Sequence, residues 1–400
     1  MKVLQINAVY GHGSTGTIIR DIEHLCELSG IECYIASPDP QVREAKRGYI
    51  IGNTLDHKLH ALFSRIHGKQ AYYSHIPTRQ LLYWIDKVKP NIVHLHNLHS
   101  NYIHLNMLLR YLAKKNIRTI ITLHDCWFYT GGCYHYTADG CQGWLSQCGI
   151  CPKEKRDPAS FFSKASAQIL ADRKKYFLSI PQLVVTGVSH WISDEARRTF
   201  FHNTKIITIH NGIDMNVFKP TSSDIRSRLS LEDKYIILGP ASKWLDSINK
   251  EVLLSFSQQM QHDEILLLFG ATSIHTDLPA NVQTYGYTKN REELAQLYTM
   301  ADVFANVTRE DSLSLINLEA QACGTPVVTF DQTGPKETVD DVNSFNVPVG
   351  DTLKLYEAIR KVRQQTTSET TARCRNFVRE QYNMDKMYLS FIDLYKQVGN

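Results

Sequence analysis

Short apolar runs recur along the chain, and segments with helical spacing of apolar residues separate them. The runs cover residues 3–8, 91–95, 119–123, 183–188, 206–209, 235–238, 265–269, 303–307 and 326–330. Strands that are apolar on both faces and alternate with helices are typical of parallel sheets covered on both sides. The pattern therefore predicts a doubly wound α/β architecture.

A polar stretch at 214–233 interrupts this rhythm near the middle of the chain. It contains Pro220 and several small polar residues, which is typical of a connection between domains. The last segment carries apolar residues at helical spacing, namely Met387, Tyr388, Phe391, Leu394 and Tyr395. We therefore predict an N-terminal domain over 1–217, a second domain over 218–383 and a terminal helix over 384–400 with one buried face.

Composition narrows the class of protein. With 400 residues, 43% of them hydrophobic and 21% charged, the chain has the content of a globular protein with room for two domains. The net charge of +4 argues against a nucleic-acid binder. No apolar run reaches the roughly 18 residues needed to cross a bilayer, and the first residues read as a strand rather than a signal peptide. We expect a cytoplasmic protein.

The segment 311–328 carries the first candidate site, because it joins a strand, a helix and a second strand. Ser312, Ser314 and Leu315 stand where the helix is expected to begin, so free backbone N–H groups there could bind a phosphate. Glu319, about two turns into the helix, could accept hydrogen bonds from ribose hydroxyls. In the alternative interpretation, Asp311 or Ser312 merely caps the helix and Glu319 is solvated.

The same segment resembles the E-x7-E signature of glycosyltransferase family four. Residues 319–328 are similar to the E-A-x-A-x-G-x-P-V-V that usually completes it, and Asp311, preceded by Glu310, stands where the family has its first Glu. The capsule and colanic-acid type members are the most similar. The resemblance implies a GT-B fold, with two Rossmann-like domains facing a cleft and a C-terminal helix returning to the N-terminal domain. It also implies a retaining transferase that takes its sugar from a nucleotide diphosphate sugar, with either Glu310 or Asp311 contacting that sugar.

Other motifs extend the resemblance over most of the chain. Asn211-Gly212-Ile213-Asp214 is similar to the family's hinge, and Gly16, in Gly13-Ser14-Thr15-Gly16, is similar to its first glycine loop, where close approach to the diphosphate is expected. His124 closes a buried strand, and the resemblance implies a place in the donor-sugar pocket; a lone histidine is more often structural. We interpret the nearby His94, His96 and His99 as core and acceptor-cleft residues.

The cations expected around the diphosphate depart from the family pattern. The family has an Arg and a Lys after the first strand of its second domain, whereas this chain offers only Lys243 and Lys250 there. There is no D-x-D motif, so we expect no catalytic metal. The catalytic candidates are accordingly His124, Asp311 and Glu319.

Cysteines are concentrated in the loop 126–158. Cys133, Cys141, Cys148 and Cys151 have a spacing that suits tetrahedral coordination of a structural Zn²⁺, and a metal would order a long polar loop. Disulfides and free thiols are the alternatives. Of these three states, zinc is the prediction.

Basic residues near Phe161 and Phe162 suggest contact with a membrane. They are Lys153, Lys155, Arg156, Lys164, Arg173, Lys174 and Lys175. Such a patch could touch an anionic membrane on the inner face of the cell, or form a solvated helix face. The resemblance implies a glycan acceptor, often lipid-linked, as in exopolysaccharide, capsule or O-antigen synthesis. The alternatives are a nucleotide-sugar epimerase of the same fold and an inactive zinc-knuckle binding protein.

Overall fold

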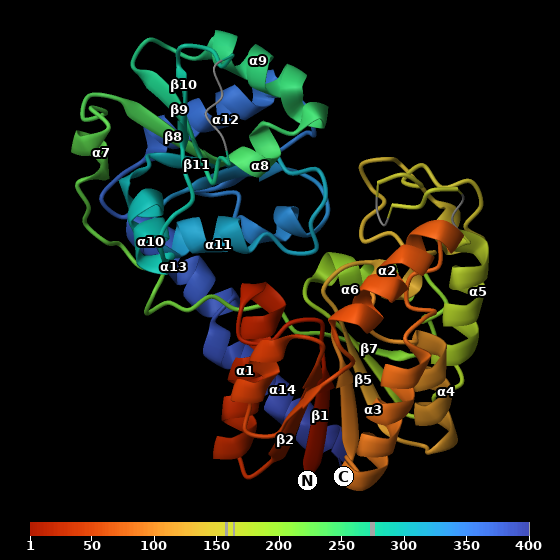
Figure 1. The fold of residues 1–400 in the computed structure, drawn as a ribbon. Coiled ribbons are helices and arrows are strands. Elements are labelled where there is room, and N and C mark those ends of the chain that lie inside the picture. The colour runs from red at the N-terminus through yellow and green to blue at the C-terminus, as the bar shows by residue number, and fades with distance from the viewer. Residues whose placement is uncertain (157–158, 163–164, 273–276, 400) are drawn as a thin grey trace. The chain divides into compact units, whose positions relative to one another are not determined.

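The chain forms two compact units. The computed structural model describes residues 1–156, 159–162, 165–272 and 277–399. Unit 1 comprises residues 1–210 and 388–400, and unit 2 comprises residues 211–387. Each described unit is built on one parallel sheet with helices on both of its faces (Figure 1). The doubly wound prediction is confirmed.

In the part of unit 1 that is described, the sheet has seven strands in the order β3-β2-β1-β4-β5-β6-β7. The strands are β1 (Lys2–Ile6), β2 (Glu32–Ser37), β3 (Gly48–Ile50), β4 (Ile92–Leu95), β5 (Arg118–Leu123), β6 (Leu183–Gly187) and β7 (Lys205–Thr208). The strand order reverses between β1 and β4, and the carboxyl ends of such strands are where ligands bind in open α/β sheets.

Helices of unit 1 cover its sheet (Figure 1). They are α1 (Gly13–Leu28), α2 (Thr54–His67), α3 (His75–Val88), α4 (Leu105–Lys114), α5 (Ser166–Phe177), α6 (His190–Arg197) and most of α14 (Met384–Gly399). Of these, α2 and α6 begin at a capping side chain. For α2, Asn53 and Asp56 form a reciprocal capping box, and Gly68 ends the helix in the left-handed conformation with φ 62°.

The terminal helix α14 returns to the N-terminal sheet, as predicted. Its first turn belongs to unit 2, and the residues from Tyr388 onward belong to unit 1. The Tyr388 hydroxyl donates to Asp21 at 2.7 Å, and Gly399 packs against Met1, so the two ends of the chain lie together (Figure 1). The apolar stripe predicted for this helix is buried throughout.

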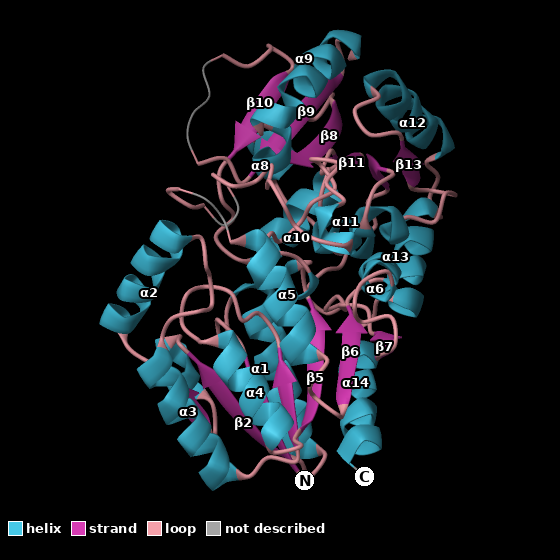
Figure 2. Ribbon diagram, turned by 90° about the vertical axis from the view of Figure 1, so that its right-hand side faces the viewer, coloured by secondary structure: helices cyan, strands magenta, loops and turns pink. Residues whose placement is uncertain are grey.

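The described part of unit 2 holds a six-stranded sheet in the order β10-β9-β8-β11-β12-β13, drawn in magenta in Figure 2. Its strands are β8 (Tyr235–Pro240), β9 (Glu264–Phe269), β10 (Val282–Tyr285), β11 (Val303–Asn306), β12 (Val327–Phe330) and β13 (Phe345–Val347). Its helices are α7 (Ile225–Arg228), α8 (Ala241–Trp244), α9 (Lys250–Gln259), α10 (Arg291–Met300), α11 (Leu315–Ala322), α12 (Thr352–Gln365) and α13 (Thr370–Gln381). Trp244 fills its core and donates from Nε1 to the Ala305 carbonyl at 2.9 Å.

Unit 2 begins in the hinge-like motif. Ile213 forms a β-bridge with Asn383, and a Cβ on Gly212 would lie 2.3 Å from the Met384 Cα. These contacts assign the segment from Asn211 onward to unit 2. Among the described residues, no helix is long and apolar enough to span a membrane.

Candidate active site

In unit 2, the connection from β11 to α11 is held by a buried asparagine. The Asn306 amide donates to Ser314 Oγ at 3.0 Å and to Asn317 Oδ1 at 2.8 Å, and Asn317 in turn donates to Thr338 at 2.8 Å. This network ties the end of β11 to the first turn of α11. Residues 307–314 therefore form an ordered loop at the carboxyl edge of the sheet.

The loop buries a hydroxyl that has no partner. Ser312 is 3% exposed, and its Oγ forms no hydrogen bond within the described residues. A Cβ on Gly334 would lie 1.9 Å from the Ser312 carbonyl oxygen, so the glycine allows a close approach of two backbone segments. Buried polar atoms are normally satisfied, and a buried atom without a partner suggests a group that binds a ligand. Ser314 is the N-cap residue of α11, and Leu315, its first residue, is partly exposed.

Glu319 is a partly buried carboxylate rather than a solvated one. It accepts a hydrogen bond from the Tyr298 hydroxyl at 3.0 Å. Burial raises the pKa of Glu319 to about 7, although the Tyr298 hydrogen bond and the charge of Arg291 act in the opposite direction. Asp311 accepts weakly from the Leu313 N–H at 3.4 Å and does not cap α11, which begins at Leu315. The solvated-glutamate interpretation is therefore wrong.

A cation that the sequence interpretation did not consider lies near Lys243. The Asn249 side chain is buried; its amide donates to the carbonyls of Lys243 and Val307, both at 3.0 Å. Its oxygen accepts from Arg309 Nε at 2.8 Å. Within the described ranges Arg309 forms no ion pair, and Lys250 is exposed at the start of α9. The sequence signal for Arg309 was its position directly before Glu310 and Asp311.

In unit 1, Gly16 packs against the loop that follows β1. A Cβ at this position would lie 3.1 Å from Val9 and 3.3 Å from the Gly11 nitrogen, and the Gly11 N–H donates to the Gly16 carbonyl at 2.9 Å. The glycine therefore lets the loop close tightly on the start of α1. Its contact with a diphosphate stays a prediction.

Two side chains, Gln5 and His96, fix the hydrogen-bonding state of His124. Gln5 donates from Nε2 to the Ile19 carbonyl at 3.1 Å, so its Oε1 is the atom that faces His96 Nε2, at 3.2 Å. An amide oxygen can only accept, so His96 Nε2 carries a proton. His96 Nδ1 lies 3.1 Å from His124 Nε2.

Both histidines are neutral near pH 7. Burial lowers the pKa of His96 well below its usual range and lowers the pKa of His124 to about 4. A neutral His96 that is protonated on Nε2 has a bare Nδ1, which must accept from His124 Nε2–H. His124 Nδ1 is therefore left as a hydrogen-bond acceptor at the carboxyl end of β5.

The other two histidines of the predicted cluster are His94, which lies in the core, and His99, which lies nearer the surface. His94 is fully buried, and its ring nitrogens lie 2.6 Å from the Tyr395 hydroxyl and 2.7 Å from Thr122 Oγ1. His94 therefore anchors α14 to β4 and β5. His99 is partly exposed and pairs with Asp125 at 3.1 Å.

The structure does not support the predicted zinc site. Cys133, Cys141, Cys148 and Cys151 line one cavity together, and none of the four forms a disulfide among the described residues. Among the described residues, no group of three or more His, Cys, Asp or Glu side chains is placed to hold a metal ion. Burial raises the pKa of the Cys133 thiol to about 12.

Packing orders the loop that was expected to need a metal. Tyr136 stacks on Trp144 with ring centroids 4.4 Å apart. The Arg173 guanidinium lies 3.8 Å from the Trp127 ring centroid and donates to the Thr130 carbonyl at 2.6 Å. Aromatic contacts and one buried arginine therefore hold the loop against α5.

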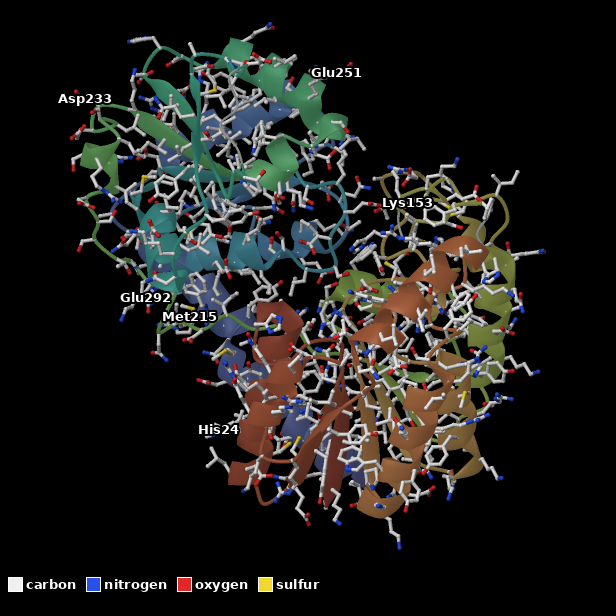
Figure 3. The ribbon with its side chains drawn as sticks, in the orientation of Figure 1. His24, Lys153, Met215, Asp233, Glu251 and Glu292 are labelled. Atoms are coloured by element: carbon white, nitrogen blue, oxygen red, sulfur yellow. The ribbon has the colours of Figure 1, made fainter. Side chains whose placement is uncertain are left out.

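The predicted basic patch is smaller than expected. Arg173 and Lys153 are buried, and Lys153, labelled in Figure 3, pairs with Asp139 at 3.4 Å. Arg156 pairs with the same Asp139, and Lys164 lies outside the described residues. The exposed members whose positions are described are Lys155, Arg156, Lys174 and Lys175, and Arg156 is the one of these that pairs with Asp139.

Comparison with known proteins gives a consistent picture. The model of Glycosyltransferase Family 4 matches residues 18–217, and that of Glycosyl transferases group 1 matches residues 244–365. The chain is 24% identical over 319 residues to the putative colanic acid biosynthesis glycosyl transferase WcaC of Escherichia coli (strain K12), covering 77% of each protein. It is 26% identical over 271 residues to D-inositol 3-phosphate glycosyltransferase of Mycobacteroides abscessus, covering 59% of each.

Solved structures share the fold. A glycosyltransferase from Rickettsia africae ESF-5 superposes with a TM-score of 0.70 at 14% identity, covering 99% of this chain and 98% of that one. Anabaena Alr3699/HepE, in complex with UDP-glucose, superposes with a TM-score of 0.64 at 14% identity, covering 99% and 100%. The family model matches half of the chain, and the topology of the two sheets agrees with it. The chain therefore belongs to glycosyltransferase family four, has the GT-B fold and is a glycosyltransferase.

Proposed function

We propose that the enzyme transfers a sugar, with retention of anomeric configuration, from a nucleotide diphosphate sugar to a glycan acceptor in polysaccharide synthesis. The observation that carries the proposal is the buried Ser312 hydroxyl, which has no hydrogen-bond partner among the described residues. Ser312 lies just before α11, and α11 also holds Glu319. A helix N-terminus with free donors suits a diphosphate. Family membership favours glycosyl transfer over the epimerase and inactive-protein alternatives.

Residues of unit 2 bind the donor in this proposal. Ser312, Ser314 and the N–H groups around Leu315 hydrogen-bond the diphosphate. Its charge is neutralised by Lys243, Lys250 and Arg309, which stabilises the departing nucleotide diphosphate. The Glu319 carboxylate accepts from ribose hydroxyls, and Glu310 or Asp311 orients the donor sugar.

In this proposal, residues of unit 1 help to bind the donor sugar, and unit 1 also binds the acceptor. The bare His124 Nδ1 accepts a hydrogen bond from a sugar hydroxyl, and Gly16 admits the diphosphate to the loop after β1. The bond from the anomeric carbon to the diphosphate breaks while the bond to the acceptor oxygen forms on the same face. The acceptor's proton passes to the departing diphosphate, so no protein base is assigned.

The acceptor in this proposal is lipid-linked, and the enzyme binds the inner face of the membrane. The support comes from α2, which Figure 2 shows at the outer edge of unit 1. Its exposed apolar residues are Leu55, Leu59, Leu62 and Phe63, with 41–65% of each exposed. Phe161 and Phe162 are 56% and 73% exposed, and the Phe161 N–H donates to the Arg65 carbonyl of α2 at 2.8 Å. An apolar helix face beside exposed aromatic rings is typical of interfacial binding.

A thermal-shift screen of UDP-, GDP- and ADP-sugars tests the donor assignment. A ligand that binds only the folded state raises the melting temperature. We expect one nucleotide series to raise it, and Glu319→Gln to reduce the shift. If no nucleotide sugar changed the melting temperature, the proposal would be wrong. Analysis of the anomeric configuration of the product tests retention.

Zinc in the cysteine-rich loop stays a prediction. It is favoured by the four thiols around one cavity, and the described geometry counts against it. Binding requires the thiols to deprotonate and turn toward a common point. About one equivalent of zinc in freshly purified protein, lost in a Cys148→Ser/Cys151→Ser variant, would support it; less than half an equivalent would overturn it.

A further inference from the structure

A second cavity lies in unit 1, where the carboxyl ends of β2, β3 and β4 meet the start of α2. Its volume is about 560 Å³, and Arg43, His57, Lys58, Ser100 and Asn101 are among the residues that line it. Ligands of open α/β sheets bind at this edge, in cavities of roughly 300–1,000 Å³. The cavity is therefore large enough for a phosphorylated sugar.

The lining of the cavity is basic. It contains Arg43, His57 and Lys58 and no carboxylate among the described residues. His57 Nε2 donates to the Ile51 carbonyl at 2.9 Å, which holds the ring in place. The N-terminus of α2 adds positive potential at the same edge.

Carboxylates on the segments that flank the cavity either accept hydrogen bonds from backbone N–H groups or are exposed to solvent. Asp39 is 10% exposed and accepts from the N–H groups of Tyr10 and Gln41 at 3.1 and 3.0 Å. Asp56 accepts from the Asn53 N–H at 3.1 Å in the capping box. Glu44 is exposed and forms no ion pair in the described structure. Among the described residues, none of these carboxylates forms an ion pair with Arg43, His57 or Lys58.

The loop after β4 has an unusual backbone on this edge. Ser100 and Asn101 have positive φ angles of 91° and 61°, a conformation that is unfavourable for residues other than glycine. Such conformations concentrate at ligand-binding loops, where the surrounding structure maintains them.

We propose that this cavity binds a phosphate group of the acceptor, gripped by Arg43 and Lys58. The proposal rests on the function proposed above and names the chemical class of the acceptor. A planar guanidinium and an ammonium together match the charge and geometry of a phosphate. Lys58 lies on the same helix as the exposed Leu55, Leu59 and Leu62, so a phosphate that is attached to a membrane lipid is close to the apolar face that we assign to the membrane.

Inorganic phosphate is the first probe. The Cε1–H proton signal of His57, assigned with His57→Gln, is followed by NMR while phosphate is added at low ionic strength, where screening is weak. We expect a saturable shift in the wild-type protein and at least tenfold weaker binding in Arg43→Gln/Lys58→Gln. The control Arg79→Gln/Lys205→Gln removes the same charge from exposed positions of unit 1 outside the cavity and should bind as the wild type does.

Two further probes separate the sources of the phosphate. Glucose 1-phosphate represents a soluble acceptor, and phosphatidylglycerol vesicles represent a lipid phosphate. If the Arg43→Gln/Lys58→Gln variant binds either probe at least tenfold more weakly than the control variant does, the result supports the subsite and identifies the source of the phosphate. The proposal is overturned if none of the three probes binds saturably, or if both double variants bind them equally.

Failure of this inference is distinguishable from failure of the proposed function. Arg43→Gln/Lys58→Gln should keep the full thermal shift with the donor nucleotide, because its donor residues in unit 2 are unchanged. An intact donor shift without any phosphate binding contradicts the subsite alone. The absence of a donor shift in the wild-type protein contradicts the proposed function itself.

Discussion

At the scale of single residues, Glu319, which we propose binds the donor ribose, also affects the pH dependence of stability. Burial raises the pKa of Glu319 from 4.5 to about 7. Between these values the folded state binds more protons than the unfolded state, so stability falls as the pH rises toward 7 and stays low above it. Glu319→Gln cannot ionise. We expect this variant to be more stable than the wild type at pH 8, by at most about 3 kcal/mol, and to show no such gain at pH 4.5.

Urea unfolding at pH 4.5 and pH 8 measures this difference. The control is Glu251→Gln, which changes an exposed glutamate of the same unit (Figure 3) and should give equal differences at the two pH values. A Glu319→Gln variant that is less stable than the wild type at pH 8 would contradict the prediction. The same variant should lose donor affinity, because a neutral amide is a weaker acceptor for ribose hydroxyls than a carboxylate.

His96 should act as a positioning residue for His124. His96→Leu removes the acceptor for His124 Nε2–H, so His124 is free to populate the other tautomer. We expect the donor KM to rise about tenfold, the effect of losing one hydrogen bond worth roughly 1.4 kcal/mol. The His96→Gln variant should have a KM close to that of the wild type, because the glutamine amide can donate to Gln5 and accept from His124.

Nitrogen-15 NMR of the histidine rings supplies a readout that a loss of stability would not change. The wild type and His96→Gln should both show His124 protonated on Nε2, and His96→Leu should show a mixture. If His124 in the wild type carried its proton on Nδ1, the assignment would fail.

The sequence identified some of these residues by their position, but it did not reveal their protonation or hydrogen-bonding states. His124 was predictable because it follows a buried strand. Its tautomer depends on Gln5 and His96, which are 91 positions apart in the chain and meet only through the pairing of β1 with β4. Arg309 and the unpartnered Ser312 hydroxyl depend in the same way on packing by Asn249 and Gly334.

At the scale of elements, the helical phase of α5 corrects the predicted basic patch. The buried residues of this helix are Ser166, Ile169, Leu170, Arg173 and Phe177. Their spacing turns Arg173 inward and leaves Lys174 and Lys175 outside. Apolar periodicity could have revealed this, but the run of three basic residues suggested a single surface.

Arg173→Met should therefore destabilise the cysteine-rich loop. The substitution leaves the carbonyls of Trp127 and Thr130 without their donor and removes the cation from the Trp127 ring. We expect a loss of roughly 3 kcal/mol and faster proteolysis within residues 130–156. Lys174→Met changes the adjacent exposed residue and should have neither effect. Equal proteolysis of the two variants would count against this role of Arg173.

Strands were predictable where the sequence is a short apolar run, including β7, which lies at a sheet edge and is not buried. The apolar runs correspond to β1, β4 to β9, β11 and β12. The strands β2, β3, β10 and β13 lie at or next to sheet edges, where sequences such as Glu-Cys-Tyr-Ile-Ala-Ser and Val-Gln-Thr-Tyr mix polar and apolar residues. Edge strands need fewer apolar residues, so hydrophobic pattern alone does not separate them from loops.

At the scale of the whole chain, the polar stretch at 214–233 predicted the division into two units, and hydrophobic spacing predicted the terminal helix. The return of that helix to the N-terminal domain was implied by the family resemblance. The surface that we propose meets a membrane was not predictable, because the sequence drew attention to basic residues near Phe161 and Phe162, whereas side-chain exposure also singles out α2. Leu55, Leu59 and Leu62 have the spacing of a core-facing stripe, and sequence alone assigns such a stripe to the interior. Their exposure was visible only after the packing of unit 1 was known.

Vesicle co-sedimentation tests the assignment of this surface. Leu59→Glu/Phe63→Glu places two charges in the apolar face of α2, and we expect at least tenfold weaker binding to phosphatidylglycerol vesicles. The control Leu353→Glu/Leu389→Glu changes two leucines that are 65% and 57% exposed on other helices and should bind normally. Binding should also fall as salt increases, because the exposed Arg65 and Lys155, which lie outside the cavity, supply the general attraction to anionic lipid. If both double variants sedimented alike, α2 would not be the membrane-binding face, and a lipid-linked acceptor would have to reach the enzyme by another surface.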